Sequence, residues 1–406
     1  MSKFIILFAR GYEVIVAFFL LKLMSDFLTP EEYAKLNLFV AITQGIALFF
    51  ISPLQNWILV NNKEAQSGNW LTSLIMFELI YATFLATLAY IFCYYSGFNQ
   101  NIIKNGLFTL FLAAIILPVL AQTVLPVLNL QGEVKKFVIY SLVGTSLGFI
   151  MPLMFVIIFK ANFVIWLYGT LLAQFIIVIF ILTFNFRIYS GTIFSGMKFI
   201  PFRKILLFSV PLSVAIGFQW YNAQGFRLSL QHIINLNMLG AFIMGFSFGG
   251  KFLNAIEKVF STVLLPALYN RNDDASAKRE WLIYVGKLSL LYSLSSIFVI
   301  CLSHYIYPIL ISDEYSAGLQ YIIAGVIFDM FRCIQNAVYQ YNLISSKNHI
   351  QLIINMFMSI SIFVLVLVIQ IYNLDFQLFV ISLPIIMASM TIIAFIINTM
   401  DKNENS

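Results

Sequence analysis

Charged side chains interrupt the long apolar runs of this sequence at ten positions. A charge near the centre of a bilayer costs at least about 2.5–3.5 kcal/mol on insertion scales, so most such residues should face an aqueous cavity or a partner. Basic residues placed in this way can bind an anionic ligand, and a desolvated carboxyl can carry a proton. The ten are Arg10, Glu13, Lys22, Glu78, Lys251, Glu257, Lys258, Lys287, Asp329 and Arg332.

Three basic residues, Arg10, Lys251 and Arg332, are the candidates for binding a substrate phosphate. The planar fork of arginine matches phosphate oxygens. Arg10 lies three residues before Glu13, and the same spacing separates Asp329 from Arg332, so each pair can neutralise itself along one helix face. Two interpretations stay open for each pair: a structural ion pair that lets the helix insert, or an arginine for which a phosphate competes.

Lys251 differs from the two arginines because its own predicted helix offers no counterion. It follows a pair of glycines in the middle of an apolar run and has no acidic residue three or four positions away. We expect it to line a cavity or to pair between helices with Glu78, Asp329 or Glu13.

The acidic residues Glu13, Glu78 and Asp329 are candidates for ion coupling or charge pairing. Glu78 has no basic neighbour on its own predicted helix, so desolvation can keep it neutral and make it a proton-coupling site. The other four charged residues lie nearer the ends of the runs, and we predict that they anchor the chain at the interface: Lys22, Glu257, Lys258 and Lys287.

Catalytic and metal-binding patterns are missing from the sequence. The histidines His232, His304 and His349 are isolated, the three cysteines show no CxxC or Cys/His spacing, and no glycine-rich phosphate loop occurs. We therefore expect no catalytic residue, no metal, no cofactor and no enzymatic activity.

The composition is that of an integral membrane protein. Of the 406 residues, 61% are hydrophobic and only 10% are charged, compared with about 45–50% and about 25% in soluble domains. Runs of about 20 apolar residues, each long enough to cross the hydrocarbon core, recur throughout. We predict twelve spans, near residues 4–24, 36–59, 70–95, 106–128, 137–159, 163–184, 205–225, 238–268, 282–303, 318–343, 350–372 and 376–397.

The loops between these spans differ in charge. Alternate loops carry thirteen Lys and Arg residues on one side and four on the other, the four being Lys35, Lys104, Lys160 and Arg227. By the positive-inside rule both termini are cytoplasmic. Because the net charge of +6 is scattered between spans, nucleic acid is not an expected partner.

The predicted spans fall into two parallel halves. A constant offset of 213 residues brings Pro53 onto Pro266 and Gln122 onto Gln335, with the spans between them in step. A central cavity between two bundles is the expected consequence. The predicted division is an N-terminal lobe at 1–184, a cytoplasmic amphipathic connector at 185–204, a C-terminal lobe at 205–397 and a cytoplasmic tail at 398–406.

Three stretches resemble the polysaccharide-export flippases of the Wzx type. They are LTPEEYAKLNL at 28–38, NMLGA at 237–241 leading to LLPAL at 264–268, and PILISDEYSAG at 308–318. This family belongs to the multidrug/oligosaccharidyl-lipid/polysaccharide exporter superfamily, together with multidrug extruders and lipid II flippases. The resemblance covers nearly the whole chain, although lipid II flippases usually carry two further spans.

The resemblance implies a MATE-like, all-α fold of about 12 transmembrane helices in two pseudo-symmetric six-helix lobes. It also implies alternating access around a cationic cavity that moves an undecaprenyl-diphosphate-linked oligosaccharide, such as an O-antigen or capsule repeat unit, to the outer leaflet. The implied location is a bacterial cytoplasmic (inner) membrane. Besides the lipid-linked oligosaccharide, the implied partners are H⁺ or Na⁺, a polysaccharide polymerase and a chain-length regulator.

Two other functions stay open. A multidrug extruder coupled to Na⁺ or H⁺ would need an acidic cavity, whereas the charges within the runs are six basic and four acidic. A membrane polysaccharide polymerase or acyltransferase would usually show a substantial extracytoplasmic loop or a catalytic His/Asp set. The longest break here is cytoplasmic and has about 20 residues, too short for such a loop.

Overall fold

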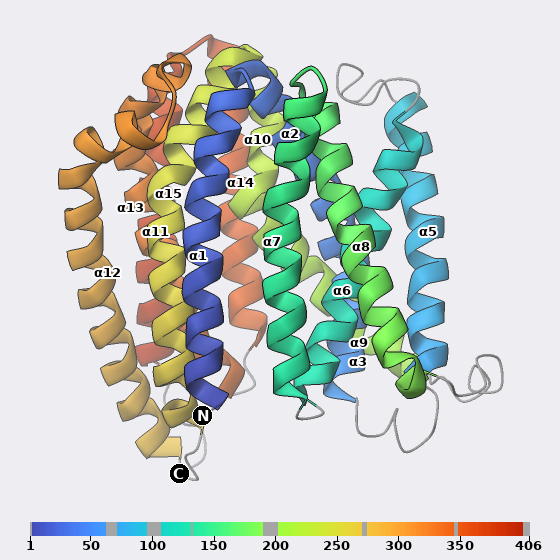
Figure 1. Cartoon of the computed structure of the whole chain (residues 1–406). Coiled ribbons are helices and arrows are strands. Elements are labelled where there is room, and N and C mark those ends of the chain that lie inside the picture. Colours follow the sequence, from blue (N-terminus) through green and yellow to red (C-terminus); the bar gives the residue numbers. More distant parts are fainter. Residues whose placement is uncertain are drawn as a thin grey trace. The chain divides into compact units, whose positions relative to one another are not determined.

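A computed structural model describes residues 2–61, 71–95, 107–130, 133–189, 202–269, 274–344 and 348–400. Within these ranges every regular element is a helix, as the apolar runs predict (Figure 1). In the first half of the chain these are α1 (Ser2–Phe27), α2 (Pro30–Ile46), η1 (Ala47–Ile51), α3 (Ser52–Val60), α5 (Leu71–Tyr95), α6 (Phe108–Leu130), α7 (Val134–Ile158) and α8 (Phe163–Tyr189). In the second half they are α9 (Phe202–Trp220), η3 (Tyr221–Gly225), α10 (Phe226–Leu230), α11 (Leu236–Tyr269), α12 (Asp274–Leu310), η4 (Asp313–Tyr321), α13 (Ile322–Ile344), α14 (Asn348–Tyr372) and α15 (Phe376–Met400).

These elements form twelve continuous helical segments in the described ranges, one for each predicted span. Eleven of them are long and apolar enough to cross a membrane. The twelfth, α1, has 26 residues, and at about 1.5 Å per residue it also exceeds the thickness of the hydrocarbon core. The predicted all-α, multi-pass membrane architecture is confirmed. Most of the predicted connector at 185–204 lies outside the described residues.

Contacts divide the chain into two compact units. Unit 1 comprises Met1–Val16 and Lys35–Gly225, and unit 2 comprises Ala17–Ala34 and Phe226–Ser406. These units differ from the predicted lobes in two segments. The second half of α1 and the start of α2 belong with the C-terminal helices, whereas α9 and η3 belong with the N-terminal ones.

In unit 1, α9 is held by close packing against the second span. This span changes to π geometry at η1, and the seventh changes at η3. A Cβ on Gly217 would lie 2.2 Å from the ring of Phe49, and one on Gly45 would lie 2.6 Å from the ring of Trp220. The glycines therefore let each backbone approach an aromatic ring of the other span. π-helical turns often accompany such local adjustments.

In unit 2, the segment after Val16 is held by buried tyrosines. The Tyr315 hydroxyl donates to the Leu28 carbonyl at 2.8 Å, and the Tyr307 hydroxyl donates to the Tyr315 carbonyl at 3.0 Å. The Ser312 amide donates to Ser25 Oγ at 3.2 Å. Since these groups are in a membrane-spanning chain, where each unmade hydrogen bond is costly, they fix the end of α1 to the turn before η4.

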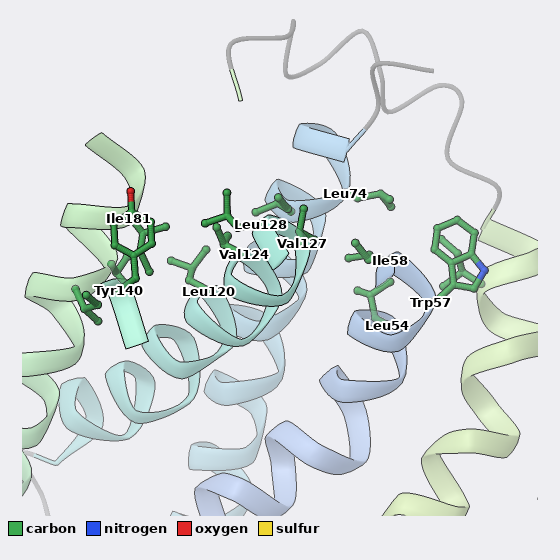
Figure 2. Close-up of a cluster of buried hydrophobic side chains, with 14 residues drawn as sticks. Leu54, Trp57, Ile58, Leu74, Leu120, Val124, Val127, Leu128, Tyr140 and Ile181 are labelled. Atoms are coloured by element: carbon green, nitrogen blue, oxygen red, sulfur yellow. The ribbon is translucent and has the colours of Figure 1, made fainter. Parts of the chain in front are cut away.

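The interior of unit 1 contains an apolar cluster drawn from six helices. Figure 2 shows Leu54, Trp57 and Ile58 of α3 beside Leu74 of α5, with the α6 side chains next to them. Its buried members are Leu54, Trp57, Ile58, Leu74, Ile75, Leu120, Val124, Val127, Leu128, Tyr140, Ile177, Val178, Ile181 and Ile205. Aromatic and aliphatic side chains thus surround the helix turns on which the polar residues of unit 1 lie.

In unit 2, glycines bring α11 into direct backbone contact with η4 and α13. A Cβ on Gly245 would lie 1.9 Å from the Gly318 carbonyl oxygen, and one on Gly325 would lie 2.0 Å from the Phe246 carbonyl oxygen. Small residues at helix contacts allow this separation in membranes, where packing replaces the hydrophobic effect as the driving force. We call this contact the glycine seam.

The glycine seam predicts a position-specific effect of one methyl group. Gly245→Ala should lower the stability of the detergent-solubilised protein by about 1–3 kcal/mol, the usual effect of overpacking. The measurement is thermal unfolding, monitored by the reaction of a thiol reagent with the buried cysteines as they become exposed. The matched control is Gly286→Ala in α12, where an added Cβ meets nothing within 4 Å. Equal stability of the two variants would contradict the seam.

Candidate functional site

Polar side chains form a stripe along one face of α11. Ser247, Lys251 and Asn254 lie at spacings of four and three residues, which is the repeat of one helix face. Glu257 continues the stripe by three more residues, and Gly250 lies within it. A membrane-spanning helix with such a stripe needs a polar environment along that face.

A second stripe runs along α13 and faces the first. It consists of Asp329, Arg332, Cys333 and Asn336, again at spacings of three and four. Arg332 Nη2 donates to Asn254 Oδ1, and Asn336 Nδ2 donates to Glu257 Oε1 at 2.9 Å. Contacts therefore advance in the same direction along both helices. The glycine seam lies nearer the N-terminal ends of α11 and α13. The close approach there brings the two stripes within hydrogen-bonding distance in the following turns of both helices.

The Asp329 and Arg332 side chains form the ion pair that their spacing predicts. Arg332 Nε donates to Asp329 Oδ1 at 2.7 Å, and the side chains are 12% and 25% exposed for the acid and the base respectively. The carboxylate occupies space that a side chain at position 250 would take, because a Cβ there would lie 1.7 Å from Asp329 Oδ2. The absence of a side chain at Gly250 therefore leaves the space that the Asp329 carboxylate occupies.

Lys251 is half-buried on the stripe of α11 and has no counterion among the described residues. Asp329, one of its predicted partners, is paired with Arg332 instead. Arg227 of α10 is close enough for the two positive charges to repel each other. The described part of the chain thus places a second cation near Lys251 and pairs Lys251 with no acidic residue.

Arg227 is the site residue that sequence reasoning missed. We assigned it to a loop because the apolar run ends near residue 225, but the helical segment continues through η3 and α10 to Leu230. Its Nη2 donates to Ser247 Oγ at 3.3 Å, and its buried Nε has no hydrogen-bond partner in the described structure. The signal available in the sequence was the unbroken run of helix-compatible residues from 226 to 230.

Glu257 was predicted to anchor the chain at the interface. Its carboxylate instead accepts hydrogen bonds from Asn336 and, at 3.4 Å, from Cys333 Sγ, so it belongs to the contact between the stripes. Lys287 of α12 is exposed, and the side chain of Lys258 lies outside the described residues.

The predicted Arg10 and Glu13 pair lies in the part of α1 that belongs to unit 1. Ser141 Oγ donates to Glu13 Oε1 at 2.7 Å, and Tyr12 and Ser146 form a hydrogen bond of the same length. α1 is therefore tied to α7 by two polar contacts. The side chain of Arg10 is outside the described residues, so the pair stays a prediction.

Glu78 lies on α5 and is 1% exposed. Thr123 Oγ1 of α6 is 2.7 Å and 2.9 Å from its two carboxyl oxygens, and Gln55 Nε2 of α3 donates to the same Thr123 oxygen at 3.0 Å. Three helices of unit 1 therefore converge on one carboxyl. No ion pair involves Glu78 within the described ranges.

Comparison with solved structures identifies the fold. An inward-facing multidrug resistance MATE family transporter of the MOP superfamily matches with a TM-score of 0.63 and 15% identity, over 97% of this chain and 94% of that chain. An outward-facing structure matches with a TM-score of 0.62 and 15% identity, over 98% and 93%. A MATE in complex with Br-NRF matches with a TM-score of 0.55 and 14% identity, over 98% and 94%. No family model and no curated protein matches the sequence.

These likenesses define the class of the protein. The chain is an all-α, multi-pass membrane protein with a MATE-like fold, as predicted. The fold extends over nearly the whole length of both chains. The more specific resemblance to Wzx-type flippases stays a prediction.

The ion pair predicts energetic coupling between its two residues. Asp329→Asn alone leaves Arg332 without its counterion and should destabilise the protein more than the double variant Asp329→Asn/Arg332→Gln. A double-mutant cycle on unfolding in detergent should give a coupling energy of about 0.5–3 kcal/mol, the range for groups in contact. Additive effects would show that the pair contributes nothing and that each side chain acts alone.

Proposed function

We propose that this chain is a membrane transporter that moves an undecaprenyl-diphosphate-linked oligosaccharide, an O-antigen or capsule repeat unit, to the outer leaflet by alternating access. The observation that carries the proposal is the excess of basic residues on the polar stripes of unit 2 together with Arg227. Arg227 of α10 lies near Lys251 of α11, and Arg332 of α13 is neutralised by Asp329.

In this part of unit 2, the three basic residues outnumber the two acidic residues, Asp329 and Glu257. Arg332 is paired, and Glu257 accepts from an amide and a thiol. Arg227 is attracted by Asp329, but that carboxylate already holds Arg332 at 2.7 Å. Lys251 has no partner in the described ranges. Since an uncompensated cation in a membrane-spanning helix is costly, an anion bound between Lys251 and Arg227 would remove that cost.

A diphosphate matches this combination of donors. Arg227 has an unused Nε donor, and its Nη2 makes only a long hydrogen bond to Ser247. Arginine forks bind phosphate oxygens in a bidentate manner, and the lysine ammonium adds a point charge. A lipid-linked anion also reaches membrane-spanning helices without leaving the bilayer, because its isoprenoid tail stays in the hydrocarbon.

A multidrug extruder is the second candidate, since two of the similar solved structures are described as multidrug resistance transporters. An organic cation would require excess negative charge on the binding surface. Together with Arg227 of α10, the described stripes carry three basic and two acidic residues, so we favour an anionic cargo.

The proposed orientation places both termini in the cytoplasm of a bacterial cell, with the chain in its cytoplasmic (inner) membrane. The sequence assigns thirteen Lys and Arg residues to one side and four to the other, the asymmetry that the positive-inside rule associates with cytoplasmic termini. A polysaccharide polymerase and a chain-length regulator are the proposed protein partners.

Removing either Lys251 or Arg227 should slow transport of the lipid-linked anion. In proteoliposomes that contain a fluorescent undecaprenyl-diphosphate oligosaccharide, Lys251→Gln and Arg227→Gln should each slow transbilayer movement about tenfold or more, because a hydrogen bond to a charged group contributes about 1.5–3 kcal/mol. The matched control is Lys287→Gln, which removes an exposed lysine of the same unit and should leave the rate unchanged.

The same vesicles separate the two transport hypotheses. Movement of the lipid-linked oligosaccharide by the wild-type chain, lost in both variants, supports the proposal. Efflux of organic cations driven by a pH or Na⁺ gradient, with no movement of the lipid, would replace it with a multidrug extruder.

A further inference from the structure

We propose that Glu78 of unit 1 is a reversible proton-binding site, separate from the polar stripes of unit 2. Its use as the coupling site of transport rests on the function proposed above, whereas proton binding itself does not. Three observations support the proposal: the burial of the carboxyl, the absence of other charged side chains on the described helix turns around it, and a hydrogen-bond network that can hold either protonation state.

The carboxyl is enclosed by apolar side chains. Glu78 is 1% exposed, and it lies one turn after Leu74 and Ile75, which are both members of the apolar cluster shown in Figure 2. Leu120 and Val124 of the same cluster flank its partner Thr123 on α6. A carboxylate in such surroundings must be neutralised by a cation or by a proton.

Among the described residues, the elements packed against this part of α5 offer no cation. The sequences of α3, η1 and α6 contain no ionisable side chain. The helix α9 touches α5 through Phe202 and Phe77, whose ring centroids are 5.2 Å apart, and its Arg203 and Lys204 are exposed. The other titratable residues of α5 are Tyr81, Tyr90, Cys93, Tyr94 and Tyr95. A proton is therefore the available neutralising charge.

The hydrogen bonds around Glu78 can be completed in both protonation states. When the carboxyl is ionised, the Thr123 hydroxyl donates to it at 2.7 Å, and Gln55 Nε2 donates to Thr123 Oγ1 at 3.0 Å and to the Val119 carbonyl at 3.2 Å. When the carboxyl is protonated, its own O–H donates to Thr123 Oγ1. The Thr123 hydroxyl then turns to the Val119 carbonyl, which is 3.0 Å away.

This exchange requires only the rotation of one hydroxyl hydrogen. Thr123 Oγ1 has two acceptor lone pairs, so it can accept from Gln55 and from Glu78 at once. No heavy atom has to move for the proton to bind or leave. The arrangement also disfavours a metal cation. Such a cation needs several oxygen ligands around it, whereas both carboxyl oxygens here are within 2.9 Å of the Thr123 oxygen and are hydrogen-bonded to it. In a transporter, such a carboxyl would let a proton gradient act on unit 1.

Labelling with dicyclohexylcarbodiimide tests proton binding directly. This lipid-soluble reagent modifies protonated carboxyls in apolar surroundings. In the purified full-length protein in liposomes, mass spectrometry should locate the label at Glu78 at neutral pH, and labelling should fall as the pH is raised and the carboxyl loses its proton. The exposed Glu133 of the same unit is the internal control and should stay unlabelled at neutral pH.

Two variants test the network. Thr123→Val removes the hydroxyl that donates to the ionised carboxylate, so labelling should persist to a higher pH than in the wild type. Glu78→Gln should abolish the label and, in transport vesicles, the response to a pH gradient, while cargo still exchanges without a gradient.

The outcomes are independent of the cargo. An unlabelled Glu78 at all pH values would overturn the proposal even if lipid-linked oligosaccharides are transported. Protection of Glu78 by Na⁺ at constant pH would also overturn it, in favour of a cation site. Labelling of Glu78 without any transport of the lipid would uphold proton binding and remove the proposed function instead.

Discussion

The structure depends on how each charge within a membrane-spanning helix is compensated. Water is not available in the hydrocarbon core, so an ionisable side chain needs a counterion, a set of hydrogen bonds, a proton or a ligand. Asp329 and Arg332 neutralise each other, whereas Glu78 is held by Thr123 and makes no ion pair within the described residues. Lys251 has neither a counterion nor a hydrogen-bond partner in the described structure. These three solutions distinguish a structural pair from a protonation site and from a ligand site.

Close packing between helices determines which charged side chains can reach a counterion. The glycine seam between α11 and α13 brings two polar stripes together, and Gly250 leaves the space that the Asp329 carboxylate fills. Once that acid is held by Arg332, it cannot also neutralise Lys251. The glycines of α11 and α13 therefore help to determine which charged residues of the site are neutralised, because they determine which side chains can meet. The same principle holds in unit 1, where Gly45 and Gly217 let α9 approach the second span.

Much of the fold could be predicted from the sequence because hydropathy and length nearly determine a membrane helix. All twelve spans were predicted in this way, and the spacing of Asp329 and Arg332 predicted their ion pair. The role of Arg227 was missed because hydropathy ends the seventh span before the helix ends. The assignment of α9 to unit 1 and of residues 17–34 to unit 2 could not be predicted. It depends on contacts such as that of Tyr315 with Leu28, which link residues 287 positions apart.

The central claim is that the cations of unit 2 hold an anion, and direct binding tests it most simply. Isothermal titration calorimetry of a short-chain isoprenyl diphosphate with the detergent-solubilised protein should show binding that weakens as salt is added. The double variant Lys251→Gln/Arg227→Gln should lose at least about a hundredfold in affinity, since two charged hydrogen-bond donors are removed. Equal affinity of the double variant and the wild type would contradict the account.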